Sequence, residues 1–315
     1  MASGLQGCPL QEIVIHPENP YYKTDGQTVF SGDNNKTLYY LSPKKQGEYI
    51  VPSFVTRIGQ SAFRGGKLSK LIMGDQITFI DTFYLCGNTI SAIILPSYIT
   101  TIPDGMFWGC WRLSSINLPD SITQIGTYAF ISCSGLSNTQ LPNRLTTLGN
   151  NVFESCSSLR KITLPKNLIN IGSGVFQGIK QINITSLNPD IFVDGFQMYK
   201  DRNQTLFTYL GVDSDYDVTV LGSCTSISSG TFSSKQLRNV YFSSNINISF
   251  GDDSFRFSSV KSIIFPPGLK NLGYRSFGNC DGLSSVTFQG NQITTIPELC
   301  FESCQSLSDI TLQNQ

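Results

Sequence analysis

One pattern of apolar positions repeats along the chain at an interval of 23 residues. In each copy an Ile or Leu is followed five residues later by a Phe, and then by a short alternating segment that ends before a proline. Four consecutive copies lie at Ile102/Phe107, Ile125/Phe130, Leu148/Phe153 and Ile171/Phe176. Self-similarity at a fixed period of this size indicates a solenoid, in which each coil buries its apolar side against the next.

The segment before each proline predicts a short β-strand. In residues 159–164, Ile162 and Leu164 alternate with polar residues, so both point inward from an extended chain. Pro165 then ends the strand, because proline cannot donate to a hydrogen-bond ladder. Stacked coils therefore form a parallel sheet on one side of a curved array.

Two segments interrupt the period, and they are similar to each other. Residues 17–50 carry turn pairs at Asn19-Pro20 and Asp25-Gly26 between short aromatic runs, and residues 188–220 repeat this arrangement 168 to 169 positions later. Turn residues between β-prone runs predict β-hairpins.

These patterns divide one predicted domain, residues 1–315, into successive parts. The parts are a partial repeat (1–16), a first hairpin insert (17–50), a repeat array (51–187), a second hairpin insert (188–220) and a second array (221–315). The further units of the arrays are placed at Ile58/Phe63, Phe79/Tyr84, Ile227/Phe232, Phe250/Phe255, Leu272/Phe277 and Ile296/Phe301. We therefore predict about ten repeats of about 23 residues.

Charge argues against several functions. Charged residues make up 14% of the chain, and 22 basic residues balance 22 acidic ones without a Lys/Arg cluster. Nucleic-acid binding and attraction to a membrane surface both lack their main electrostatic contribution. No apolar run of about 18 residues is present, so no membrane insertion of this chain is expected. The first seven residues lack a signal-peptide pattern, which indicates either synthesis in the cytosol or a fragment without its targeting ends; we favour the fragment.

No constellation of residues predicts catalysis. His16 is the single histidine, and no partner motif accompanies it, so a turn or surface position is expected. Residues 213–217 resemble the first half of a calcium loop, but Val218 and Cys224 stand where Gly and Glu are needed, so a hairpin loop is favoured. Asp252-Asp253 is read as an exposed turn, and the glycines as turn residues with positive φ. We predict no enzyme activity, no catalytic residue, no metal and no cofactor.

Five of the nine cysteines share one slot of the repeat. They are Cys110, Cys133, Cys156, Cys280 and Cys304. Neighbours in this slot stack at a distance that permits a disulfide, but their Cβ vectors point the same way. We expect a ladder of reduced, buried thiols in preference to disulfides or a metal site, and we interpret Cys300 as a packing residue.

The outward side chains of the strands form the candidate binding surface. The predicted row is Ile72, Ile94, Asn117, Gln140, Thr163, Asn183, Tyr241, Ile264 and Thr287. This row is neutral, and exposed apolar residues lie toward both of its ends. Solenoids bind partners through such extended surfaces. A solvated sheet face that keeps β-branched residues for strand propensity is the alternative for any single position.

The repeat unit resembles a known family. Residues 122–136 and 145–165 are similar to the BspA-type leucine-rich repeat, with Ile/Leu-Gly, Phe, Cys and Leu at the matching positions. Thr139 in place of the strand Ile and Ile179 in place of the Cys depart from its pattern. The resemblance implies a leucine-rich-repeat solenoid (α/β-class, β-rich), a curved right-handed coil stack with a parallel sheet on one face.

The resemblance also implies a function. Such proteins are cell-surface or secreted proteins of host-associated bacteria and parasitic protists that act in adhesion. We therefore expect a host extracellular-matrix or cell-surface protein, or a glycan, as partner, and a cytoplasmic protein-interaction scaffold as the alternative. The sequons at Asn35, Asn183, Asn203 and Asn247 become informative only if a eukaryote secretes the protein.

Overall fold

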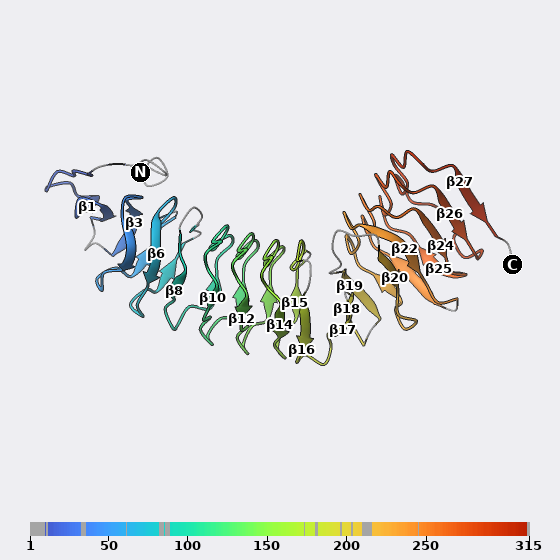
Figure 1. The fold of residues 1–315 in the computed structure, drawn as a ribbon, viewed down its shortest axis with the longest axis horizontal. Helices are drawn as coiled ribbons and strands as arrows, with labels where there is room; N and C mark the ends of the chain where they lie inside the picture. The colour runs from blue at the N-terminus through green and yellow to red at the C-terminus, as the bar shows by residue number, and fades with distance from the viewer. Residues whose placement is uncertain are drawn as a thin grey trace. The chain divides into compact units, whose positions relative to one another are not determined.

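The chain folds into stacked coils of strands and turns (Figure 1). The computed structural model describes residues 10, 12–32, 36–60, 62–81, 85, 89–172, 174–179, 182–195, 197–202, 204–209, 216–244 and 246–313. The predicted solenoid with parallel sheets is confirmed, and in these residues it is wholly β, without the helical part of an α/β-class fold. Two compact units are present, Met1–Asn188 (unit 1) and Pro189–Gln315 (unit 2), and each is described by itself. The boundary coincides with the predicted start of the second insert, and a single domain over residues 1–315 stays a prediction.

Each repeat of unit 1 contributes strands to two ladders. The main ladder contains β4 (Gln46–Ile50), β6 (Lys67–Ile72), β8 (Ala92–Ile94), β10 (Ser115–Ile116), β12 (Asn138–Thr139), β14 (Lys161–Leu164) and β16 (Asn183–Ser186). The return ladder contains β5 (Arg57–Ile58), β7 (Phe79–Ile80), β9 (Thr101–Ile102), β11 (Gln124–Ile125), β13 (Thr147–Leu148) and β15 (Asn170–Ile171). The hydrogen-bonded pairs are parallel, because successive coils run in the same direction. Hydrogen bonding divides the main ladder into the sheets β4-β6-β8, β10-β12 and β14-β16, and it divides the return ladder between β7 and β9.

Unit 2 repeats this arrangement. Its main ladder contains β20 (Tyr216–Thr219), β22 (Leu237–Tyr241), β24 (Ser262–Phe265), β26 (Ser285–Phe288) and β27 (Asp309–Leu312). Its return ladder contains β21 (Ser226–Ile227), β23 (Asn247–Phe250) and β25 (Gly268–Asn271). The strands in both ladders again pair in parallel.

Both inserts form the predicted hairpins, extended to three antiparallel strands. The first contains β1 (Tyr22–Thr24), β2 (Thr28–Ser31) and β3 (Thr37–Leu41), and the second contains β17 (Phe192–Asp194), β18 (Gln197–Lys200) and β19 (Thr205–Tyr209). The pairing of the second and third strands shifts between Val29 and Phe30, and at the matching place between Met198 and Tyr199. The third strand of each insert then pairs in parallel with β5 or β21. Each insert therefore begins the return ladder of its unit.

One predicted repeat is out of register by one residue. Ile80, and not Phe79, pairs with Ile58 in the return ladder. Phe79 is exposed, and its ring lies 4.5 Å from the Arg57 guanidinium carbon. Phe79 was predicted as the first position of this repeat because Tyr84 follows it five residues later. Tyr84 lies outside the described residues.

Stacked phenylalanines run through the core, as the period predicts. Phe107, Phe130, Phe153 and Phe176 are at most 1% exposed, and successive ring centroids lie 4.8, 5.4 and 5.9 Å apart in nearly parallel planes. The distances in unit 2 are 4.7 Å for Phe232–Phe255, 4.8 Å for Phe255–Phe277 and 5.5 Å for Phe277–Phe301. Each ring is thereby covered by the ring of the adjacent coil, which is why no repeat can bury its Phe alone.

Two residues with left-handed backbone flank each of these phenylalanines. Tyr128 and Ser132, both with φ of 59°, lie on either side of Phe130. The N–H groups of all three donate to carbonyls of the next coil, at N–O distances of 2.9, 2.9 and 2.8 Å. The same pair of positions recurs at Gly105/Gly109, Asn151/Ser155, Gly174/Gly178, Gly230/Ser234, Asp253/Phe257, Arg275/Asn279 and Leu299/Ser303. This turn therefore links neighbouring coils by backbone hydrogen bonds outside the strands.

Glycines serve two purposes in the repeat, and only one was predicted. Gly109 has a φ of 68° and open space where a Cβ would lie, so positive φ explains it, as expected. Gly126, which follows the return strand β11, has no positive φ, and a Cβ there would lie 2.7 Å from the backbone N of Asp104. The glycine of the Ile-Gly motif is therefore required by close contact between coils.

Candidate binding face

The main ladder of unit 1 presents one outward row of side chains. In each main-ladder strand one outward residue directly follows a buried apolar or Thr position, as Ile72 follows Leu71. We call the row of these outward residues the face row. Register places Ile50, Ile72 and Ile94 opposite one another on β4, β6 and β8. Asn117 and Gln140 continue the row as exposed side chains, directly after β10 and β12. The predicted row is therefore present in this part of the sheet.

One predicted member of the row was wrong. Asn183 pairs with Lys161 and so lies in the neighbouring row, whereas Thr185 pairs with Thr163. The Oγ1 atoms of these two threonines are 2.9 Å apart. Ile182 and Ile184 are two residues apart, so both side chains point to the same side of the strand. Alternation alone therefore cannot decide which of them lies opposite Ile162. The pairing of β14 with β16 places Ile184 opposite Ile162.

Unit 2 carries the remaining predicted members. Tyr241, Ile264 and Thr287 follow one another on β22, β24 and β26, because the flanking residues of these strands pair in register. Thr219 precedes them opposite Tyr241, and Thr311 follows opposite Thr287. The prediction for this unit holds in position; a binding role for these residues stays a proposal.

Apolar side chains on the face row gather in two clusters, one in each unit. In unit 1, Ile50 is 61% exposed and Ile94 is 51% exposed, with the less exposed Ile72 between them. In unit 2, Tyr241 is 50% exposed and Ile264 is 53% exposed. The sequence prediction missed Ile50 because it was assigned to the first insert, although its spacing of 22 residues from Ile72 matches the repeat.

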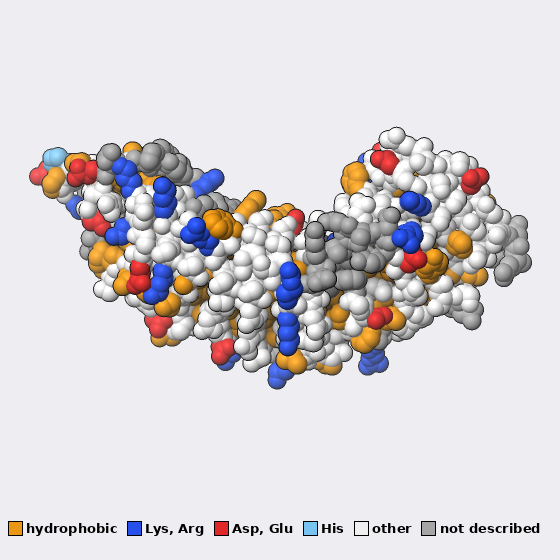
Figure 2. Space-filling model, viewed as in Figure 1, with side chains coloured by type: hydrophobic (Ala, Val, Ile, Leu, Met, Phe, Trp, Pro, Cys, Tyr) orange, Lys and Arg blue, Asp and Glu red, His pale blue; other side chains and the backbone are white. Residues whose placement is uncertain are grey.

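The described residues of the face row are uncharged, whereas the row next to it carries Glu48, Lys70, Lys161, Asp217 and Asp309. Lys70 and Glu48, in the row next to it, form an exposed ion pair at 2.9 Å. In unit 2, the Asn239 amide donates to Asp217 at 2.9 Å. Figure 2 shows charged side chains of both signs scattered over a mostly neutral surface. Contact on the face row itself relies on apolar area and neutral hydrogen bonds, and charges of both signs border it.

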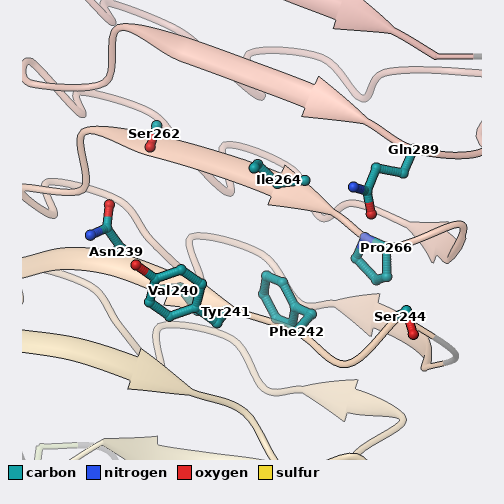
Figure 3. A pocket seen from close by; sticks show the side chains of 9 residues that line it. All are labelled: Asn239, Val240, Tyr241, Phe242, Ser244, Ser262, Ile264, Pro266 and Gln289. Atoms are coloured by element: carbon teal, nitrogen blue, oxygen red, sulfur yellow. The ribbon is translucent and has the colours of Figure 1, made fainter.

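A pocket of about 310 Å³ opens on the face of unit 2 (Figure 3). Its lining residues are Asn239, Val240, Tyr241, Phe242, Ser244, Ser262, Ile264, Pro266 and Gln289. Asn239 and Ser262 lie toward one end in Figure 3, Tyr241 and Ile264 in the middle, and Gln289 and Ser244 toward the other end. None of the lining side chains is charged. Two predicted face-row residues thus line a pocket that the sequence did not predict.

The cysteines of the repeat slot are packed in the core. The Cys133 thiol donates to the Phe107 carbonyl at 3.0 Å, and the Cys280 thiol donates to the Phe255 carbonyl at 3.0 Å. Burial raises the pKa of Cys280 to about 11, and a hydrogen bond with Cys156, followed by burial, raises that of Cys133 well above its ordinary value. Thiols of raised pKa are poor nucleophiles, so these groups favour a structural role. None of the seven described cysteines is in a disulfide; Cys8 and Cys86 lie outside the described residues.

Other candidate residues from the sequence lie on the surface. His16 is exposed, and its Nδ1 accepts the N–H of Glu18 at 3.3 Å, as in a turn. Asp252 is exposed and accepts the Tyr274 N–H, whereas Asp253 is half-buried beside Arg256. In the described ranges, no three His, Cys, Asp or Glu side chains are placed to hold a metal ion.

Some of the predicted features cannot be placed. Residues 213–215 of the calcium-like loop lie outside the described residues, as do the sequons at Asn35 and Asn203. The sequon residues Asn183 and Asn247 are exposed strand residues.

The comparisons with known proteins identify the family. The sequence profile of the BspA type leucine rich repeat region matches six copies, over residues 5–88, 35–135, 81–200 and 223–315. These ranges cover most of the chain, and the chain belongs to this family. No curated protein matches the sequence.

Solved structures show the same fold. A leucine rich cell surface protein from Faecalibacterium prausnitzii A2-165 is 21% identical, with a TM-score of 0.60 over 94% of this chain and 96% of that one. The pneumococcal vaccine antigen PcpA is 19% identical, with a TM-score of 0.67 over 96% and 88%. A leucine-rich repeat protein from Eubacterium ventriosum ATCC 27560 is 18% identical, with a TM-score of 0.57 over 90% and 75%.

Nothing in the described part of the chain has the length and hydropathy of a membrane-spanning helix.

Proposed function

We propose that this chain is a non-enzymatic adhesion protein, displayed at a cell surface or secreted, that binds a host or matrix protein or a glycan through its face row. The observation that carries this proposal is the pair of half-exposed apolar clusters, Ile50–Ile72–Ile94 in unit 1 and Tyr241–Ile264 in unit 2. Contiguous apolar side chains on an otherwise polar surface mark interaction sites, and aromatic anchors concentrate binding energy.

Two further observations support a binding role over catalysis. The thiols are buried and hydrogen-bonded to backbone carbonyls, and the single histidine is an exposed turn residue. Proteins of this repeat family are binding scaffolds. In the described strands, the face row therefore offers neutral hydrogen-bonding groups and carries no acidic or basic side chain.

The surface location rests on relatives. The F. prausnitzii structure is described as a cell surface protein and PcpA as a vaccine antigen. This chain shares the fold of both proteins. A surface location is therefore part of the proposal.

A triple substitution tests the face. Ile72→Ser, Ile94→Ser and Tyr241→Ser together should weaken binding to a captured matrix or host-cell protein by at least about tenfold, because they remove the apolar anchors of both units. The ligand is first identified by pull-down and mass spectrometry, and binding is then measured by biolayer interferometry. Each substitution should cost about 1 kcal/mol or less of the free energy of unfolding, because Ile94 and Tyr241 are half-exposed and Ile72 is only partly buried. The variant should therefore stay folded at the temperature of the binding measurement.

The matched control removes similar exposed apolar area elsewhere. Tyr98, Ile169 and Leu187 are at least 61% exposed and lie outside the face row. Their replacement by Ser should leave binding unchanged. Unchanged binding in the face-row variant, or equal loss in both, would place recognition on the inserts or on another surface.

An intracellular interaction scaffold is the second candidate. It is favoured by the seven described cysteines, none of which is in a disulfide, since reduced thiols are the rule in the cytosol. Surface labelling of intact cells distinguishes the two candidates. A chain labelled only after lysis would exclude the adhesin.

A further inference from the structure

The pocket on unit 2 has hydrogen-bonding groups that the protein itself leaves unused. Within the described part of the chain, the side chains of Ser244, Ser262 and Gln289 make no hydrogen bond. The Asn239 amide N–H donates to Asp217, which leaves its carbonyl oxygen as an acceptor. These polar groups lie toward both ends of the pocket, with the half-exposed Tyr241 and Ile264 between them. The pocket thus combines an apolar floor with neutral donors and acceptors at its ends.

This combination selects among ligand chemistries. No Lys or Arg lines the pocket to neutralise an anion, and no Asp or Glu lines it to hold a cation. A purely apolar ligand would cover the amide and hydroxyl groups and leave them unpaired, which is costly. A saturated, chair-shaped ring with axial C–H groups on its faces and equatorial hydroxyl groups around its edge satisfies both parts of the pocket. The C–H groups meet the negative face of the Tyr241 ring, and the hydroxyls reach the amides.

We propose that this pocket binds one neutral pyranose unit of a glycan. The volume, about 310 Å³, lies at the lower end of the range for small-molecule sites and suits a ring-sized group. The cluster on unit 1 is different, because Ile50, Ile72 and Ile94 form an aliphatic surface beside the Lys70–Glu48 ion pair. The sugar is bound on unit 2. The inference rests on the proposed function, in which the face row binds a ligand, and it assigns the chemistry of one part of that ligand.

Saturation-transfer NMR on the full chain tests the proposal. The probes are the methyl glycosides of glucose, galactose, mannose and N-acetylglucosamine, with sialic acid as a charged comparison. We expect transfer to at least one neutral glycoside, strongest at the ring protons of one face. Tyr241→Ser should weaken that binding by about tenfold through loss of the stacking surface, whereas Tyr241→Phe should retain most of it. Gln289→Met, which keeps the size of the side chain and removes its amide, should weaken it as well.

Tyr98→Ser is the matched control, because it removes an exposed tyrosine of unit 1 that lies outside the face row. It should leave sugar binding unchanged. Absence of transfer to all four neutral glycosides, a signal from sialic acid alone, or equal signals from wild type and Tyr241→Ser would each overturn the proposal.

The proposed function fails in a different way. If no neutral sugar binds but Tyr241→Ser still abolishes capture of a protein ligand, the pocket takes a protein side chain and the face-row proposal stands. If a sugar binds in a Tyr241-dependent manner but the triple face-row variant retains its protein ligand, the sugar site stands and the wider proposal fails.

Discussion

At the scale of single residues, the cysteine slot shows how one position serves neighbouring coils. Cys156 donates its thiol to the Phe130 carbonyl at 3.1 Å, and Cys304 donates to the Phe277 carbonyl at 3.1 Å. The sulfur thus satisfies a backbone acceptor of the coil before it while filling core volume. A small apolar residue could fill the space but could not make this bond, which explains why the slot repeats a thiol.

The titration of these thiols gives a testable pH dependence. Burial raises the pKa of Cys280 from 9.0 to about 11. A thiol with a higher pKa in the folded chain stabilises the fold below its unfolded pKa and loses that contribution as the pH rises through the folded value. We expect the free energy of unfolding to fall between pH 9 and 11, by about 2–3 kcal/mol for this thiol. Urea unfolding under reducing conditions at several pH values measures it.

Cys280→Ala provides the control. This variant lacks the titrating group, so its stability should fall less steeply over the same range, while the contribution of Cys300, whose pKa burial also raises to about 11, remains in both proteins. Parallel pH profiles for the two proteins would show that Cys280 does not carry the effect.

At the scale of elements, the turn around each Phe stores backbone strain at many non-glycine residues. Tyr128 and Ser132 adopt left-handed backbone that glycine would adopt without cost, yet one coil earlier the same positions are Gly105 and Gly109. The hydrogen bonds to the next coil hold the turn in this conformation whichever residue occupies it. Stacking of the coils therefore imposes the turn geometry. The residue at each position only determines the free-energy cost of the left-handed conformation.

A reciprocal exchange tests this account. Ser132→Gly should raise the free energy of unfolding by about 0.5–1 kcal/mol, because relief of the left-handed strain exceeds the entropy that glycine adds to the unfolded chain. Gly109→Ser should lower it by a similar amount, since space for the Cβ is open and only φ opposes it. Chemical denaturation of both variants gives the two values. Ser134→Gly, at a position without positive φ, should be destabilising; a gain there would point to a general effect of glycine.

The same elements show what could be predicted from the sequence and what could not. The 23-residue period placed Phe130 and Cys133 in the core, because burial repeats with the coil. Alternation placed Tyr241 and Ile264 outward. Alternation could not choose between Asn183 and Thr185, since positions two residues apart along a strand face the same side and only pairing separates them. The left-handed turns carried no reliable sequence signal, because non-glycine residues fill most of them.

The pocket was beyond prediction for a related reason. It depends on Phe242, Pro266 and Gln289, which follow their strands and lie outside the repeating outward positions. Their arrangement around Tyr241 is set by the paths of the segments that follow β22, β24 and β26, which the period does not specify. Each outward side chain was predictable by itself, and the space between them was not.

At the scale of the whole molecule, the chain consists of two units with separate sets of packed coils. Unit 2 has a continuous core that extends from Tyr199 on its insert to Cys300 near the end of the array. Unit 1 has its own phenylalanine stack from Phe107 to Phe176. In an array, stability is a sum of local terms between neighbouring repeats, so an interruption can separate the cooperative unfolding of the two sides.

This arrangement predicts two unfolding transitions that respond to different substitutions. Phe153→Ala removes a fully buried ring from unit 1, and Phe255→Ala does the same in unit 2; each should cost about 3–5 kcal/mol. In scanning calorimetry of the full chain, we expect Phe153→Ala to lower one transition and leave the other in place, and Phe255→Ala to do the reverse. A single transition lowered by both variants would contradict independent units. It would show instead that cooperativity passes through the second insert, as the single domain predicted for residues 1–315 requires.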